Sequence, residues 1–142
     1  MSRPPPTRPT DAELAILRAL WARGPAGATV RAVHEELTRA RPPGYSRPAG
    51  YTSVLKLMQI MTEKGLVTRD EADRSHIYHA AVTEADTQRL LVRDLADRAF
   101  GGSARALILQ ALCARRASPE DLAEIQRLID DYRQSSHQRG DP

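Results

Sequence analysis

The stretch Tyr51-Thr-Ser-Val-Leu-Lys-Leu-Met-Gln-Ile-Met-Thr-Glu-Lys64, which runs directly into Gly65, decides the fold. An apolar face recurs at i, i+3, i+4 and i+7 and consists of Val54, Leu57, Met58 and Met61. The opposite face carries Thr52, Ser53, Lys56, Gln59 and Glu63. Short hydrogen-bonding groups and a lysine suit the major groove of DNA, which admits a helix and exposes base edges to such groups. We call residues 51–64 the reading helix; the alternative is an ordinary amphipathic surface helix.

A short β-hairpin is predicted directly after the reading helix. Leu66-Val-Thr-Arg69 and Ser75-His-Ile-Tyr-His79 have the composition of strands and flank a charged turn. Two helices are predicted before the reading helix. Thr10-Asp-Ala-Glu13 forms a capping box for a helix that ends at Gly24, and Thr29 caps a second helix through Leu37. Together these elements predict a winged helix-turn-helix domain over residues 10–82.

A long connection, Thr38 to Gly50, separates the second predicted helix from the reading helix. Its prolines prevent a continuous helix, and Arg39, Arg41 and Arg47 place positive charge in it. Either these arginines contact backbone phosphates or the segment is a solvated loop.

Charge is distributed unevenly along the 142 residues. The net charge is +3, but up to Arg69 eleven basic residues face five acids, and the remainder is net negative. A basic first half with an acidic second half is typical of a polyanion-binding domain joined to an assembly domain, although scatter of ordinary surface charge is the alternative.

Composition excludes several kinds of site and of protein. A single cysteine, Cys113, excludes an intramolecular disulfide and a multi-cysteine metal site. No apolar run approaches the ~20 residues of a membrane span, and the first nine residues, four of them proline, read as a disordered arm and not as a signal peptide. We expect a cytoplasmic protein with no membrane insertion and no cofactor.

Three further helices are predicted over residues 83–134, followed by a disordered tail at 135–142. Thr83, Ser103 and Ser118 are their N-caps. Three short helices bury too little among themselves, so their apolar faces are expected to meet a second copy of the chain. The predicted dimerisation residues are Leu91, Leu95, Leu107, Ile108, Leu112, Leu122, Ile125, Leu128 and Ile129.

The ordered set of motifs resembles the penicillinase-repressor family of bacterial regulators (BlaI/MecI type). The matching segments are Thr10-Asp-Ala-Glu-Leu14, Leu20-Trp21, Thr29-Val-Arg31, Val33-His-Glu35, Tyr51-Thr-Ser-Val-Leu55, Lys64-Gly-Leu-Val67, His76-Ile-Tyr78 and Phe100-Gly-Gly-Ser103. The resemblance implies an N-terminal winged helix that binds double-stranded operator DNA, followed by a helical dimerisation domain. It also implies release of the repressor when a membrane sensor-protease triggers cleavage and loss of dimerisation.

Three positions depart from the family pattern. The loop Thr38–Gly50 is longer than usual, and Ile60 stands where many relatives carry a basic residue, which suggests apolar contact with a thymine methyl. The Asn-Phe bond cleaved in beta-lactam-responsive members aligns with Gln110-Ala111, so cleavage there is not carried over. The lone Cys113 likewise excludes the copper sensing of another branch.

We therefore predict a mainly α, homodimeric repressor that occupies a dyad-symmetric promoter operator. The expected DNA-binding residues are Thr52, Ser53, Lys56, Gln59, Arg31, Arg47, Lys64 and Arg74, of which Thr52, Ser53 and Lys56 are candidates for base contacts. The alternative function is a winged-helix protein-interaction module. Enzyme and metal sites are rejected, because His76 and His79 point to opposite faces of a strand and no oxyanion signature accompanies any serine.

Overall fold

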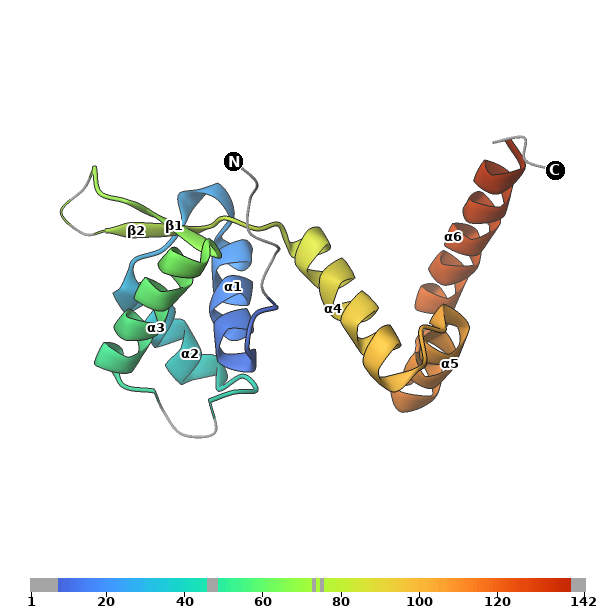
Figure 1. Ribbon diagram of the computed structural model, residues 1–142, viewed down its shortest axis with the longest axis horizontal. Coiled ribbons are helices and arrows are strands. Elements are labelled where there is room, and N and C mark those ends of the chain that lie inside the picture. The colour runs from blue at the N-terminus through green and yellow to red at the C-terminus, as the bar shows by residue number, and fades with distance from the viewer. Residues whose placement is uncertain (1–7, 46–48, 73, 75, 139–142) are drawn as a thin grey trace. The chain divides into compact units, whose positions relative to one another are not determined.

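The structure is a computed structural model that describes residues 8–45, 49–72, 74 and 76–138. Its elements follow the predicted order (Figure 1). The N-terminal elements are α1 (Asp11–Arg23), the short 3-10 helix η1 (Gly24–Ala26), α2 (Val30–Ala40), α3 (Tyr51–Lys64), β1 (Val67–Asp70) and β2 (Ile77–Ala80). They are followed by α4 (Glu84–Ala99), α5 (Ala104–Ala114) and α6 (Pro119–Gln138). The prediction of a mainly α chain with a winged helix-turn-helix before a helical segment is confirmed.

Local side-chain chemistry sets the helix ends. The Thr10 hydroxyl accepts from the Glu13 backbone N–H, and the Glu13 carboxylate accepts from the Thr10 backbone N–H, which completes the predicted capping box of α1. Thr29 caps α2 through the Ala32 amide. Gly65 ends α3 in the left-handed conformation, φ 80°. Helix α2 continues to Ala40, three residues beyond the expected end.

One core joins the first three helices to the wing. Strands β1 and β2 pair antiparallel, and Ala28 adds an isolated bridge to Tyr78 on the outer edge of β2. The buried apolar side chains are Ala15, Ile16, Leu17, Leu20, Ala28, Val30, Val33, Leu37, Val54, Met58, Met61, Leu66, Val67 and Tyr78. Because α3 contributes three of these and the strands contribute Val67 and Tyr78, the reading helix and the wing are fixed to the same core.

The chain divides into two compact units, residues 1–94 and 95–142. The boundary falls inside α4 and not at residue 82, as the sequence had suggested. Two side chains of α4 explain the difference, because Thr87 is buried and Asp94 forms an ion pair with Arg8. The first unit therefore includes most of α4.

Two predicted disordered segments also need correction at their edges. Pro9 is buried and Arg8 pairs with Asp94, so these two residues are packed on the first unit and do not belong to a disordered arm. Helix α6 runs to Gln138, so residues 135–138 are helical where a disordered tail was expected. Within the described residues, no helix combines the length and apolar character needed to cross a lipid bilayer.

Candidate DNA-binding surface

The reading helix α3 has the two faces that its sequence predicts. Val54, Met58 and Met61 are buried in the core. On the opposite side Thr52, Ser53, Lys56, Gln59 and Glu63 are exposed. The buried face anchors the helix, so its polar face is presented outward on a rigid element. Ile60 lies on the border of this outer face and is 36% exposed.

A concave surface adjoins the polar face, and we call it the wing groove. It has a volume of about 570 Å³ and lies where the start of α2, one side of α3 and the wing meet. Its lining residues are Thr29, Val30, Arg31, Tyr51, Leu55, Gln59, Arg69, Arg74, His76 and Tyr78. Three arginines and no acid occur among these described residues, so the groove suits an anionic backbone.

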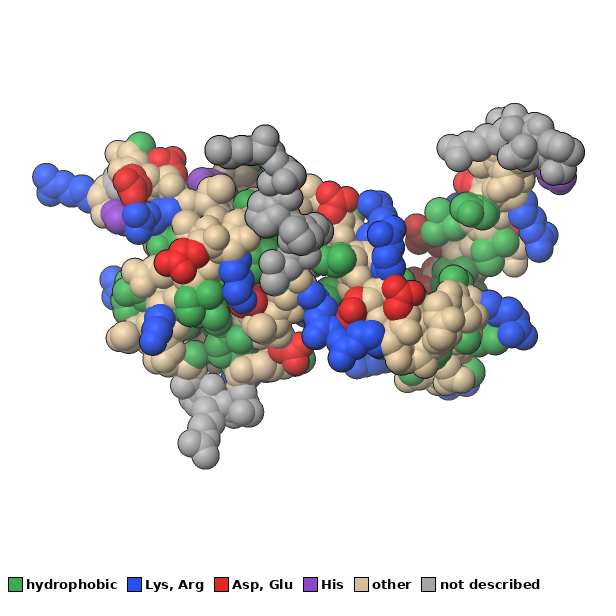
Figure 2. All heavy atoms as spheres, in the orientation of Figure 1, with side chains coloured by type: hydrophobic (Ala, Val, Ile, Leu, Met, Phe, Trp, Pro, Cys, Tyr) green, Lys and Arg blue, Asp and Glu red, His purple; other side chains and the backbone are tan. Residues whose placement is uncertain are grey.

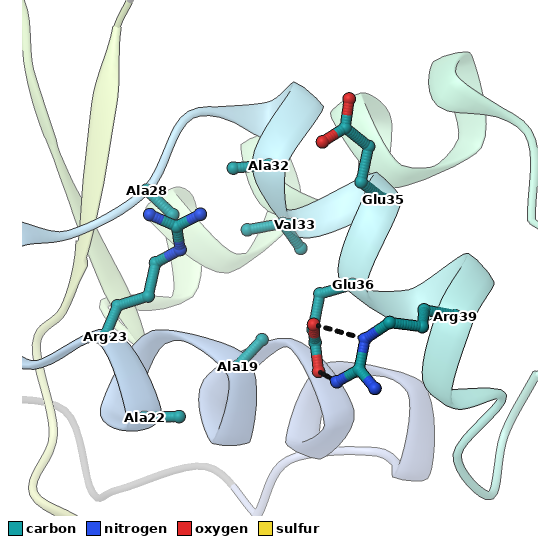
Figure 3. A pocket seen from close by; sticks show the side chains of 9 residues that line it. All are labelled: Ala19, Ala22, Arg23, Ala28, Ala32, Val33, Glu35, Glu36 and Arg39. Carbon is teal, nitrogen blue, oxygen red and sulfur yellow. Dashed lines mark hydrogen bonds and ion pairs between the residues drawn. The ribbon is translucent and has the colours of Figure 1, made fainter.

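A second hollow, between α1 and α2, has a different chemistry (Figure 3). Its volume is about 360 Å³, and Ala19, Ala22, Ala28 and Ala32 line it. Two acids and two arginines also line it, and Glu36 is bonded to Arg39 at 2.6 Å, as the dashed lines in Figure 3 mark. Balanced charge gives this hollow no preference for a polyanion, in contrast to the wing groove.

Three of the predicted DNA-binding residues line the wing groove: Arg31, Gln59 and Arg74. Arg31 also lies 3.6 Å from Glu35, but both side chains are largely exposed, so this ion pair is weak and easily exchanged for a phosphate. Arg47 lies outside the described residues.

Lys64, one of the expected DNA-binding residues, has an ion-pair partner within the protein. Its ammonium lies 2.9 Å from the carboxylate of Glu13, a side chain that is only 1% exposed. A buried carboxylate is costly without a partner, so Lys64 has a structural role within the first unit. We therefore leave it out of the proposed DNA contacts.

Tyr51, Arg69 and His76 also line the wing groove, although they were not among the expected DNA-binding residues. A signal existed for Tyr51, because Tyr51, Leu55 and Gln59 are spaced by four residues and so form one row along the helix. Arg69 sits in β1 opposite Tyr78 and forms an ion pair with Glu71. Its place in the groove depends on strand register, which the sequence alone did not fix.

The start of α1, the long loop and the end of α3 share a cluster of hydrogen bonds. Burial raises the pKa of Glu13, but the hydrogen bonds from Thr10 and Lys64 outweigh burial, and the net pKa of this carboxyl is lowered. Tyr45 of the loop donates to the Ala12 carbonyl at 3.0 Å. Burial, and then the negative charge of Glu13, raise the pKa of Tyr45 to about 12. At neutral pH this cluster contains a carboxylate and a neutral phenol.

Comparison with known proteins identifies the family of this chain. Residues 9–131 match the family described as penicillinase repressor. The chain is similar to "Transcriptional regulator BlaI" of Mycobacterium tuberculosis, strains CDC 1551 / Oshkosh and ATCC 25618 / H37Rv, each 35% identical over 105 residues that cover 72% of this chain and 70% of the relative. It is also similar to the solution structure of the Bacillus licheniformis BlaI monomeric form in complex with the blaP half-operator. That likeness has a TM-score of 0.45 and 17% identity over 57% of this chain and 89% of the other. Because the family match extends over nearly the whole described chain, this protein belongs to the penicillinase-repressor family.

Proposed function

We propose that this protein is a transcriptional repressor that binds double-stranded DNA as a homodimer, with α3 in the major groove. The observation that carries the proposal is the pairing of an anchored helix, polar on its outer face, with an adjoining groove lined by three arginines and no described acid. Membership of a family described as repressors supports the same activity and disfavours an enzyme. Repression would follow from occupancy of a promoter operator.

The proposed contacts divide into two kinds. Thr52, Ser53, Lys56 and Gln59 lie on the exposed face of α3 and are assigned to base edges. Arg31, Arg69 and Arg74 line the wing groove and are assigned to phosphates, together with the undescribed Arg47 of the predicted set. Ile60 is assigned to a thymine methyl, because an exposed aliphatic side chain beside the polar face has few other partners in the groove.

Dimerisation is assigned to the C-terminal helices. No described residue of α5 or α6 is buried within the single chain. Figure 2 shows hydrophobic side chains on the surface of this unit. Its exposed apolar residues are Leu95, Ile108, Leu109, Leu112, Leu122, Leu128, Ile129 and Tyr132, and Leu107 and Ile125 are half-buried. Leu91, the remaining predicted dimerisation residue, is half-buried in the first unit. So many exposed apolar side chains are typical of an interface, and a two-fold dimer would read an operator with dyad symmetry.

Release from the operator is assigned to loss of dimerisation. Two linked winged helices bind one operator with an effective-concentration advantage, and separating them removes it without change at the DNA surface. A membrane sensor-protease pathway is the proposed trigger, acting on a repressor in the cytoplasm. No scissile bond is assigned, because Gln110-Ala111 occupies the position of the family's cleaved bond.

A protein-interaction module is the second candidate function. Exposure of Ile60 and Tyr51 on or beside the reading face favours it, since apolar side chains there would also suit a protein partner. This candidate predicts no selection of DNA sequence and no steep dependence of DNA binding on salt.

Selection of duplexes from a random-sequence library by the full-length chain tests the proposal. A repressor is expected to enrich an inverted repeat with half-sites about 10 base pairs or a multiple apart. The logarithm of its association constant should fall linearly with the logarithm of the salt concentration. The slope is expected to be about −0.9 for each phosphate neutralised. Failure to enrich any sequence, with a flat salt response, would favour the protein-interaction module.

A further inference from the structure

Glu13 and Lys64 connect the start of α1 to the end of the reading helix across 51 positions of sequence. One carboxylate oxygen of Glu13, Oε1, accepts from the Thr10 backbone N–H at 2.9 Å and completes the capping box. The other, Oε2, accepts from Lys64 Nζ at 2.9 Å. The cap thus uses only one of the two oxygens.

Because Glu13 is buried, its bond to Lys64 matters for stability. Glu13 is almost wholly removed from solvent, whereas the Lys64 side chain is 34% exposed and reaches in from the surface. If Lys64 left for a DNA phosphate, Oε2 would lose its cationic partner in a site that water reaches poorly, which is unfavourable. The geometry therefore favours Lys64 remaining on Glu13 when DNA is bound.

The two ends of the reading helix are held by different contacts. Near its start, His34 of α2 is hydrogen-bonded through Nε2 to the Ala49 carbonyl at 2.8 Å and contacts the Tyr51 ring edge-on, with ring centroids 6.0 Å apart. Beyond its end, the Leu66 N–H donates to the Met61 carbonyl at 2.9 Å, a contact within the same segment of chain. Besides apolar packing, the Glu13–Lys64 ion pair is thus the side-chain bond that, among the described residues, ties the C-terminal end of α3 to another helix.

We infer that Glu13 and Lys64 form a positioning pair that sets the placement of the C-terminal half of α3, and that Lys64 acts through Glu13 and not on a phosphate. The inference rests on the proposed function, because placement matters where Lys56 and Gln59 must meet base edges. These two residues lie within about two turns of Lys64, on a helix of 14 residues that is about 21 Å long. Recognition geometry tolerates displacements of only about 0.5 Å, so a small shift at Lys64 is sufficient to weaken base contacts.

Whether the substitution Glu13→Gln weakens or strengthens DNA binding distinguishes the two roles of Lys64. Glu13→Gln keeps an oxygen for the Thr10 amide but removes the charge that holds Lys64. Affinity of the full chain would be measured for the duplex that the wild type enriches and for a random duplex of equal length. A positioning pair predicts about tenfold weaker binding to the enriched duplex, relative to the control variant, with binding to random DNA equal to that of the control.

The matched control is Glu36→Gln. It makes the same change in net charge, but the partner of Glu36 is the exposed Arg39 of the same helix, away from α3. If Lys64 is a phosphate ligand, Glu13→Gln releases it and strengthens binding to both duplexes beyond the control. That outcome overturns the inference.

A second measurement needs no DNA. The double variant Glu13→Gln/Lys64→Met leaves no unpaired buried charge and is expected to fold, with wild-type helical circular dichroism. Amide hydrogen exchange should quicken at residues 59–64 and stay unchanged at residues 52–55. Equal exchange across α3 in the variant and the wild type overturns the inference. If the wild type enriches no duplex, the proposed repressor function fails, and the exchange experiment still decides whether the pair positions the helix.

Discussion

Glu13 has two roles that its local sequence reveals only in part. The Thr10-Asp-Ala-Glu13 motif predicts its bond to the Thr10 amide, because that bond spans three residues. Its bond to Lys64 joins helices far apart in sequence. The same carboxylate therefore stabilises the start of one helix and the end of another, and its protonation affects both.

Acid should weaken the fold through Glu13. Its folded pKa is lowered from the ordinary value of 4.5, so its contribution to the free energy of unfolding is present above that value and is lost as pH falls through the folded pKa. Urea unfolding of the wild type at about pH 7 and about pH 3 should show a loss of stability that is smaller in Glu13→Gln. Lys64→Met should cost about 2 kcal/mol at neutral pH, since it removes a charged hydrogen bond from the buried carboxylate. Equal acid sensitivity of wild type and Glu13→Gln would contradict this account.

Tyr45 makes the opposite prediction at alkaline pH. Burial and the charge of Glu13 raise its pKa from 10.0 to about 12. A raised pKa means that the contribution of Tyr45 is complete below the unfolded value and is lost as pH rises through the folded value. Tyr45→Phe removes the bond to the Ala12 carbonyl and should lower the free energy of unfolding by about 1 kcal/mol. In an ultraviolet titration, Tyr45→Phe should remove the tyrosinate transition near pH 12. Loss of a transition at lower pH instead would show that the raised pKa does not belong to Tyr45.

Elements whose signals are local were predicted well. The bounds of α3 match the predicted reading helix at both ends, and the caps of α1 and α2 form as the sequence indicates, because these bonds span three or four residues. Contacts set by tertiary packing were not predictable in this way. The wing groove required the strand register that places Arg69 beside α3, and the partner of Lys64 required the approach of α1. For that reason the sequence placed Lys64 only among the DNA-binding residues and gave no sign of its ion pair with Glu13.

Gly27 controls the attachment of the wing. A Cβ atom at Gly27 would lie 2.6 Å from the Tyr78 carbonyl oxygen, next to the bridge in which Ala28 and Tyr78 exchange bonds of 3.0 and 2.8 Å. Gly27→Ala is therefore expected to lower the free energy of unfolding by roughly 2–4 kcal/mol and to loosen β2. Gly24→Ala is the control, because Gly24 has a similar φ of 66° but nothing within 4 Å of a Cβ. It should cost only the backbone strain, about 1–3 kcal/mol and less than Gly27→Ala, and equal losses in thermal unfolding would remove the clash as the cause.

The outer face of α3 should carry the sequence preference. Lys56→Ala and Ser53→Ala are each expected to weaken binding to the enriched duplex by ~1–3 kcal/mol and to relax the preference at one base position. Arg31→Ala, in the wing groove, should instead weaken binding to all duplexes alike and reduce the salt slope by about 1. Arg105→Ala in α5 makes the same charge change on the C-terminal unit and is the control. Fluorescence anisotropy measures all four, and an unchanged base preference in Lys56→Ala and Ser53→Ala would exclude both from the base contacts.

The two units of the chain differ in how many apolar side chains they bury. The first, residues 1–94, contains every buried apolar residue of the core and the wing groove. The second, residues 95–142, exposes apolar side chains from α5 and α6. Hydrophobic burial dominates folding, so a unit with so little of it within one chain is expected to gain stability from a second copy.

Leu128 offers the sharpest test of that assembly. Its side chain is 63% exposed in the single chain, so Leu128→Asp removes little packing within one copy but would bury an unpaired charge at a dimer interface. The wild type should sediment as a dimer at micromolar concentration and the variant as a monomer. Affinity for a duplex with two half-sites should then fall by about 10²–10⁴, the effective-concentration advantage, whereas affinity for a single half-site stays unchanged.

A control variant and a truncated chain test the same prediction. Gln126→Asp places the same charge two residues away in α6. It removes the hydrogen bond to Asp130 and sets two acids one turn apart, which costs only about 0.5 kcal/mol plus the lost exposed bond, and should leave the dimer intact. A chain ending at Asp94 keeps the Arg8–Asp94 ion pair and the buried Thr87, so it should fold and bind DNA as the monomeric variant does. If the wild type sediments as a monomer, the assembly assignment fails. If Leu128→Asp is monomeric yet binds the two-site duplex as tightly as the wild type, loss of dimerisation cannot be the event that releases the operator.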